Sequence, residues 1–326
     1  MKENESLNVY PVPELVYLPV REWQEEDVVI VIKEEIAWQR MQPKLLDWDI
    51  GVELDAPSLP SEDAYKKLLK RADGMGEIVY AVGGTVAVDA AKYVAESMDL
   101  TLITVPTALC SDAFWMWSSS VRDKGISVPL ETIPPEIMLL DMELLAGAAE
   151  SERAVGIVDV LSISTACHDW LLAEQRGKNS VEEKYNVATA AIAKTLLQNA
   201  LDFAEAAGAG DPEGLRALIN ALTMTVQLNN LSFHSRASEG SEHHFALLAE
   251  SLDNTPRTHA ECIAPGILLM AEKQGQDAAA LRKALQAARV PLNALPQTLI
   301  DRTMKELTAF VTKHDLPYGI AWELPL

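Results

Sequence analysis

The feature that most constrains the fold is a strand, a paired-glycine turn, a helix and a second strand in close succession. The segments are, in order, the apolar run 78–82, the turn Gly83-Gly84, the helical pattern 86–97 and the apolar run 102–105. This order is typical of a βαβ unit, in which a helix joins two parallel strands. Similar apolar runs at 28–32 and 137–140 predict two more strands. We therefore expect an N-terminal α/β domain with a parallel, Rossmann-like sheet.

The second half of the chain has a different pattern, because alanine- and leucine-rich stretches dominate it. Helices are predicted over 154–174, 181–207, 212–228, 244–252, 260–273 and 278–289. Glycines and prolines separate several of these stretches, as helix-terminating residues do. The sequence thus predicts two domains, an α/β domain over residues 1–148 and an all-helical domain over residues 149–326.

The charge balance excludes several classes of partner. The 326 residues include 27 Lys and Arg and 48 Asp and Glu, so the formal net charge is −21. Nucleic acids and anionic membranes need a basic surface, and we expect neither as a partner. No apolar run approaches the roughly 18 residues of a membrane span, and the polar residues 1–8 lack the apolar core of a signal peptide. Three scattered cysteines form no disulfide framework. We expect a cytoplasmic protein that acts on a small molecule.

The glycine turn is a candidate phosphate site. Glycines between a strand and a helix let a ligand approach the backbone, and the N-terminus of a helix favours an anion. Gly83 and Gly84 have this position, and Asp89 and Lys92 follow on the helix. Many turns of this kind use glycine for geometry alone, so the motif by itself leaves both interpretations open.

One acid and two histidines form a candidate metal site. Asp159 lies among apolar neighbours in a predicted helix, so its carboxylate needs a partner. His243 and His259 each lie near a predicted helix start, where they can meet across a cleft. Two imidazoles and one carboxylate leave an open coordination position on zinc or iron, which is a catalytic arrangement. The alternative is that Asp159 pairs with an arginine and the histidines lie at the surface.

The order of these motifs resembles the dehydroquinate synthase-like and iron-containing alcohol dehydrogenase superfamily, and within it the glycerol-1-phosphate dehydrogenase branch most. The motifs that carry the resemblance are 83–95, 104–107, 111–112, 156–170, 240–243 and 259–261. They extend from about residue 78 to about residue 270 of the chain. The Asp169-Trp170 pair is what points to the glycerol-phosphate branch.

The resemblance implies both a site and an activity. It implies that Asp159, His243 and His259 bind one divalent metal, Zn²⁺ or another such as Fe²⁺ or Ni²⁺. It implies that the first domain binds NAD or NADP, and that the helical domain holds the metal. The implied cofactor-binding residues are Gly83, Gly84, Thr85, Asp89, Thr107 and Asp112, and the implied catalytic residues are Asp112, Asp159 and His243. The implied function is a metal-dependent, NAD(P)-linked oxidoreductase acting on a small polyol or polyol phosphate, with reduction of dihydroxyacetone phosphate as the model reaction. Self-association into a homo-oligomer is also implied.

Three departures from the family pattern support other readings. Thr85 replaces a third glycine, Met116 replaces a small hydroxyl residue, and Leu247 replaces a histidine that helps to hold substrate in the glycerol-phosphate branch. A catalytically altered family member that binds metal and acts as a binding protein is therefore an alternative. A sugar-phosphate cyclase of the dehydroquinate synthase type is a second alternative, and Asp159 argues against it because that branch supplies a glutamate as metal ligand.

Overall fold

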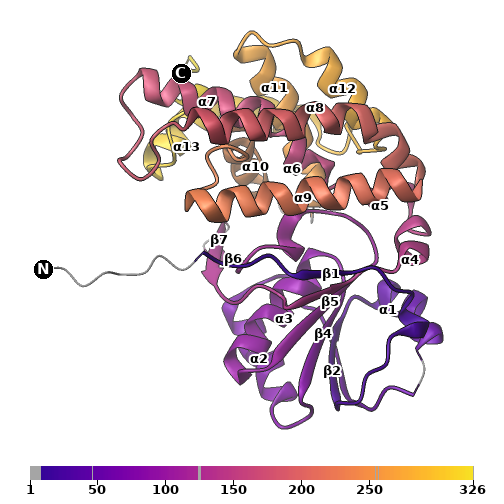
Figure 1. Cartoon of the computed structure of the whole chain (residues 1–326). Coiled ribbons are helices and arrows are strands. Elements are labelled where there is room, and N and C mark those ends of the chain that lie inside the picture. The colour runs from indigo at the N-terminus through magenta and orange to yellow at the C-terminus, as the bar shows by residue number, and fades with distance from the viewer. Residues whose placement is uncertain (1–8, 46, 124–125, 254, 256, 326) are drawn as a thin grey trace, which may run out of the picture.

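The protein has a sheet-based N-terminal half with a helical half packed at one end of the sheet (Figure 1). The computed structural model describes residues 9–45, 47–123, 126–253, 255 and 257–325. Six strands form one sheet in the order β1-β8-β5-β4-β2-β3, and all their pairings are parallel. The strands are β1 (Glu14–Val16), β2 (Val29–Lys33), β3 (Ile50–Asp55), β4 (Ile78–Gly83), β5 (Thr101–Pro106) and β8 (Ile137–Leu139).

The central strands of this sheet are buried on both faces, which explains why they are nearly continuous apolar runs. Every residue of β2 is buried, with Val29 and Val31 facing one apolar cluster and Ile30 and Ile32 facing the other. The helices of this half are α1 (Glu35–Met41), α2 (Glu62–Ala72) and α3 (Thr85–Met98), with short turns η1 (Val20–Glu22), η2 (Gln42–Lys44) and η3 (Asp112–Phe114). An antiparallel hairpin of β6 (Ser118–Asp123) and β7 (Ile126–Glu131) stands apart from the main sheet.

The helical half begins soon after the last strand. Its elements are α4 (Met142–Ala146), α5 (Glu150–Arg153), α6 (Ile157–Leu161), α7 (Ile163–Gln175), α8 (Val187–Ala209), α9 (Pro212–Ser232), α10 (Ser241–Leu252), α11 (His259–Lys273), α12 (Ala278–Ala287), α13 (Gln297–Lys313) and the turn η4 (Ile320–Trp322). The long helices α8 and α9 lie side by side, joined by a tight turn at Gly210, which has a φ of 80°. In Figure 1, α9 lies between α8 and the sheet half.

The predicted fold class is confirmed, since a parallel sheet precedes a helical region. All four predicted strands correspond to β2, β4, β5 and β8, and the helix 86–97 corresponds to α3. The predicted single helix 154–174 is wrong, because it breaks at Ser162 into α6 and α7. The hydroxyl of Ser162 lies 2.7 Å from the Ser238 carbonyl and 2.9 Å from the Asp159 carbonyl, which ties the break to a neighbouring loop. The stretch 181–186 is not helical either, because α8 begins only after its N-cap Asn186.

Other features bear on the sequence-based expectations. The last strand ends at Leu139 and α4 begins at Met142, while the division after residue 148 stays a prediction. Cys110, Cys167 and Cys262 are all free thiols, as expected. Among the described residues, no helix is long and apolar enough to cross a membrane.

Candidate metal centre and glycine turn

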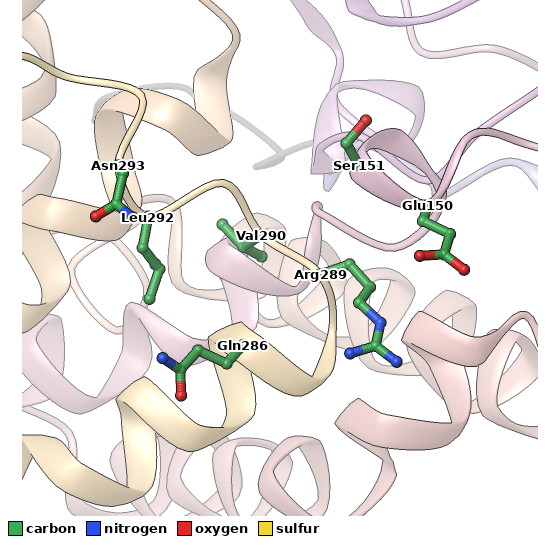
Figure 2. Close-up of a pocket in the computed structure, with 7 residues that line it drawn as sticks. All are labelled: Glu150, Ser151, Gln286, Arg289, Val290, Leu292 and Asn293. Atoms are coloured by element: carbon green, nitrogen blue, oxygen red, sulfur yellow. The ribbon is translucent and has the colours of Figure 1, made fainter.

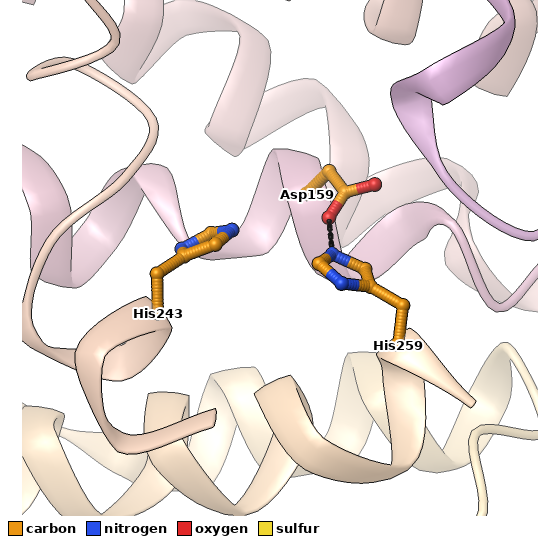
Figure 3. A group of neighbouring side chains, drawn as sticks. All are labelled: Asp159, His243 and His259. Atoms are coloured by element: carbon orange, nitrogen blue, oxygen red, sulfur yellow. Dashed lines mark hydrogen bonds and ion pairs between the residues drawn. The ribbon is translucent and has the colours of Figure 1, made fainter. Parts of the chain in front are cut away.

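Three side chains from three helices converge on one point (Figure 3). Asp159 lies on α6, His243 on α10 and His259 is the first residue of α11. One potential ligand atom from each residue lies within 4.8 Å of the other two. The Nε2 atom of His259 lies 2.7 Å from Oδ1 of Asp159. The structure thus brings together the three residues that the sequence predicts as metal ligands.

Local sequence signals explain why the two histidines reach this point. Helix α11 starts at His259 because Thr258 forms a capping box with Glu261, in which each side chain bonds the other residue's backbone N–H. Helix α10 starts directly after Gly240, where an added side chain would lie 2.9 Å from Cα of Ala166. Both histidines therefore project from the first turn of their helices.

Asp159 is tied to the sheet half through the loop that follows β5. Its Oδ2 accepts a hydrogen bond of 2.9 Å from the backbone N–H of Asp112. Close contact between this loop and α6 requires Gly156, because a Cβ atom there would lie 2.9 Å from Ser111 N and from Leu109 O. The predicted catalytic residue Asp112 is thus adjacent to the metal cluster.

His243 is held from behind by a buried glutamate. Oε1 of Glu242 lies 2.9 Å from Nδ1 of His243, and its Oε2 accepts a bond of 2.7 Å from the Thr165 hydroxyl. Glu242 is fully buried. An Nδ1–H bonded to a carboxylate leaves the lone pair of Nε2 free for a metal. Glu242 directly precedes the candidate ligand His243 in the sequence, and this position is the one sequence signal for its role.

The side chains of the cluster shift one another's pKa values. Burial lowers the pKa of His259, but the charge and hydrogen bond of Asp159 outweigh burial and raise that pKa to about 9. Burial, followed by the charge of Asp159, raises the pKa of Asp112 to about 7. Several carboxylates therefore share a buried space that favours positive charge.

A second buried acid, Asp169, fixes the start of α10. Its Oδ2 accepts from Ser241 N at 2.8 Å, and its Oδ1 accepts from Ile320 N and from Gln274 Nε2, each at 2.8 Å. Burial, and then the charge of Glu242, raises the pKa of Asp169 to about 6. Through these hydrogen bonds the Asp169 carboxylate joins α7, α10, the end of α11 and η4.

The glycine turn lies at the carboxyl end of β4, where ligands of parallel sheets bind. Gly83 has a φ of 141°, a region that side chains disfavour, and Gly84 is the N-cap of α3. The hydroxyl of Thr85 lies 3.0 Å from Oγ of Ser111, so this side chain is directed toward the loop after β5. The N–H of Gly84 donates to Oε2 of Glu34 at 3.0 Å, a contact that we did not expect from the sequence.

Two other predicted cofactor contacts lie deeper in the fold. Asp89 is buried, accepts from Ser120 N at 3.0 Å and lies 3.4 Å from Nζ of the fully buried Lys92. These bonds join α3 to the hairpin and favour a structural role for Asp89. Thr107 is buried just after β5, and its carbonyl accepts from Arg40 at 3.4 Å.

The departures from the family pattern have ordinary packing environments. Met116 and Leu247 are half-buried and pack against the main apolar core. A separate hollow of about 380 Å³ lies between α5 and the segment after α12, with Glu150 and Arg289 among its lining residues (Figure 2). None of the predicted site residues lines it.

Comparisons with known proteins agree on one superfamily. Residues 20–149 match the family model described as iron-containing alcohol dehydrogenase. The chain is 29% identical over 265 residues to the NAD(P)+ glycerol-1-phosphate dehydrogenase of Sulfolobus acidocaldarius, a match that covers 81% of this chain and 74% of that enzyme. It is 28% identical over 223 residues to the enzyme of the same name from Thermococcus kodakarensis, where the match covers 68% of this chain and only 62% of that enzyme.

A solved structure extends the likeness to the whole fold. A probable glycerol dehydrogenase from Sinorhizobium meliloti has a TM-score of 0.69 and 17% identity, covering 97% of this chain and 93% of that one. The predicted resemblance is therefore confirmed. Residues 20–149 are thus similar to the iron-containing alcohol dehydrogenase family, and the whole chain shares its fold with the solved structure of a probable glycerol dehydrogenase.

Proposed function

We propose that the protein is a metal-dependent, NAD(P)-linked dehydrogenase that interconverts a small polyol or polyol phosphate and its ketone. Reduction of dihydroxyacetone phosphate is the first reaction to test, because the relatives reported above carry the name glycerol-1-phosphate dehydrogenase. The observation that carries the proposal is the convergence of Asp159, His243 and His259 next to the loop after β5, which also contacts Thr85 beside the glycine turn.

The donor set fits a divalent transition metal. One carboxylate and two imidazoles suit Zn²⁺, Fe²⁺ or Ni²⁺, and three protein ligands leave room for a substrate oxygen. The ligand atoms are already within 4.8 Å of one another, and Glu242 holds the ring of His243 in one orientation. The specific metal is part of the test.

The residues around the cluster orient the carboxylate of Asp159 and shield it from water. The backbone N–H of Asp112 donates to Oδ2 of Asp159, so Oδ1, which lies 2.7 Å from Nε2 of His259, is the oxygen that would face the ion. Asp159 is only 3% exposed, which keeps bulk water from its carboxylate. A metal bound here would polarise the carbonyl oxygen of the substrate, and the nicotinamide would carry the hydride.

The dinucleotide fits the glycine turn with one exception. Gly83 and Gly84 add no side chains to the turn, and the hydroxyl of Thr85 is directed toward Ser111. The exception is the carboxylate of Glu34, which lies on the turn itself.

The experiment is a coupled measurement on the zinc-loaded protein. Oxidation of NADH and of NADPH is followed with dihydroxyacetone phosphate, dihydroxyacetone and related ketones, and metal content is measured on the same sample. We expect stoichiometric metal and ketone-dependent oxidation of at least one cofactor. A His314→Ala variant is the control, since this histidine is exposed and packs against Phe310; it should keep both properties.

Other outcomes separate the alternatives. Bound metal with no binding of either nicotinamide cofactor would contradict the dehydrogenase proposal and favour the altered, metal-binding family member. Consumption of a sugar phosphate with NAD regenerated in each cycle would instead indicate a cyclase.

A further inference from the structure

The carboxylate of Glu34 occupies the space that the paired glycines create. Glu34 follows β2, the strand next to β4 in the sheet, so the parallel register brings it to the glycine turn. Its Oε2 accepts the N–H of Gly84 at 3.0 Å. A Cβ atom at Gly83 would lie 3.0 Å from the same oxygen, and one at Gly84 would lie 3.4 Å from both carboxylate oxygens. The side chain therefore fills the cradle rather than passing near it.

This position is the one that a bound phosphate would use. Gly84 caps a helix of 14 residues, and α3 has neither an acidic residue in its first turn nor a capping side chain of its own. The helix start thus has a partial positive charge and a backbone N–H that can bind an anion. Glu34 supplies that anion from within the chain, and one N–H cannot serve both groups at full strength.

The charged groups near Glu34 also disfavour a second anion at the glycine turn. Burial raises the pKa of Glu34, the Gly84 hydrogen bond opposes that shift, and the charge of Glu152 raises it further. Glu152 lies on α5 of the helical half, so the charge that acts on Glu34 comes from the other half of the chain. A pyrophosphate with two negative charges would meet this field unless the carboxylate of Glu34 moves away.

We propose that Glu34 is an internal competitor for the cofactor, holding the glycine turn until the pyrophosphate displaces it. This inference rests on the proposed function, since it concerns the same cofactor. Removal of the carboxylate should free the Gly84 N–H and lower the local negative charge. Binding should therefore tighten by about tenfold, which is the value of one hydrogen bond to a charged group.

The test is a set of equilibrium titrations on the zinc-loaded protein. NADH binding is followed by energy transfer from tryptophan, and inorganic pyrophosphate binding by calorimetry. The variants are Glu34→Ala and Glu34→Gln, which remove the charge with and without the bulk. The matched control is Glu35→Ala, because the neighbouring Glu35 is exposed and pairs with Lys33 at 2.5 Å instead of with the turn. Circular dichroism confirms that each variant is folded.

We expect Glu34→Ala to bind both NADH and pyrophosphate about tenfold more tightly, Glu34→Gln to lie between it and the wild type, and Glu35→Ala to match the wild type. Equal affinities in wild type and Glu34→Ala would overturn the inference and leave the dehydrogenase proposal standing. Weaker NADH binding in Glu34→Ala would overturn it as well, because Glu34 would then be a cofactor ligand. Absence of binding in all variants would overturn both proposals. Tighter binding without any ketone reduction would support the inference and contradict the proposed reaction.

Discussion

The metal cluster and the glycine turn are neighbours, yet they are prepared for their ligands in opposite ways. At the cluster, Glu242 and the backbone of Asp112 orient two of the three donors, and the donors face one another. At the turn, the backbone has the geometry for a phosphate, but Glu34 already lies on it. The first region brings together donor atoms that suit a cation, and the second already has a carboxylate of the chain at the place where an anion would bind. Within one protein, the metal cluster therefore has its donor atoms already in place, whereas the glycine turn must lose the contact with Glu34 before a phosphate can bind there.

The largest expected effect comes from deleting a metal ligand. His259→Ala removes one of three donors and leaves Asp159 buried without its partner at 2.7 Å. We expect the zinc affinity to fall by about a thousandfold or more, since each ligand carries a large share of the binding free energy. Competition with a chromogenic chelator measures the loss. A variant that retains zinc with little change would show that the three residues are not the ligand set.

A smaller effect is expected from the glutamate behind His243. Glu242→Gln keeps the size of the side chain but weakens the bond that fixes the imidazole. Loss of such an outer partner lowers metal affinity by about 10- to 100-fold. The comparison would be sharpened if the same variant left pyrophosphate binding unchanged. Glu261→Gln is a suitable control, because this residue caps α11 without bonding either histidine ring; the same chelator assay should give the wild-type value.

The smallest effect on the metal is expected from the other region. Gly83→Ala puts a side chain at a φ of 141° and against Glu34, which should lower the free energy of unfolding by about 1–3 kcal/mol. If the two regions are energetically independent, a change at the turn should leave the zinc affinity within about twofold of the wild-type value. Denaturant unfolding and the chelator assay test the two parts. A large loss of zinc in this variant would break the distinction between the regions.

Much of this architecture was accessible from the sequence, because it depends on local patterns. The four apolar runs and the glycine turn gave the centre of the sheet, and the ordered motifs gave Asp159, His243 and His259. The hairpin β6–β7 and the helix α13 were missed, since the hairpin carries serines and charges on a half-buried surface and α13 has a polar face. Neither pattern stands out against a loop in a single sequence.

The missed site residues depend on contacts between distant parts of the chain. Glu34 and Gly84 are 50 positions apart, and only the pairing of β2 with β4 joins them. A weak signal existed, because Glu34 directly follows an apolar run in a predicted parallel sheet. Asp169 was noticed as part of a motif, but its bond to Ile320 spans 151 positions and no local pattern encodes it.

That bond has a consequence for the order of folding. Ser241, which begins the helix of His243, bonds Asp169 through its backbone and Ala321 through its hydroxyl. Contacts of such long sequence separation form late, after the intervening chain has collapsed. During synthesis from the N-terminus, both histidines emerge well before the segment that completes their support. We therefore expect the metal centre to be among the last parts of the protein to form, although its ligands come from the middle of the chain.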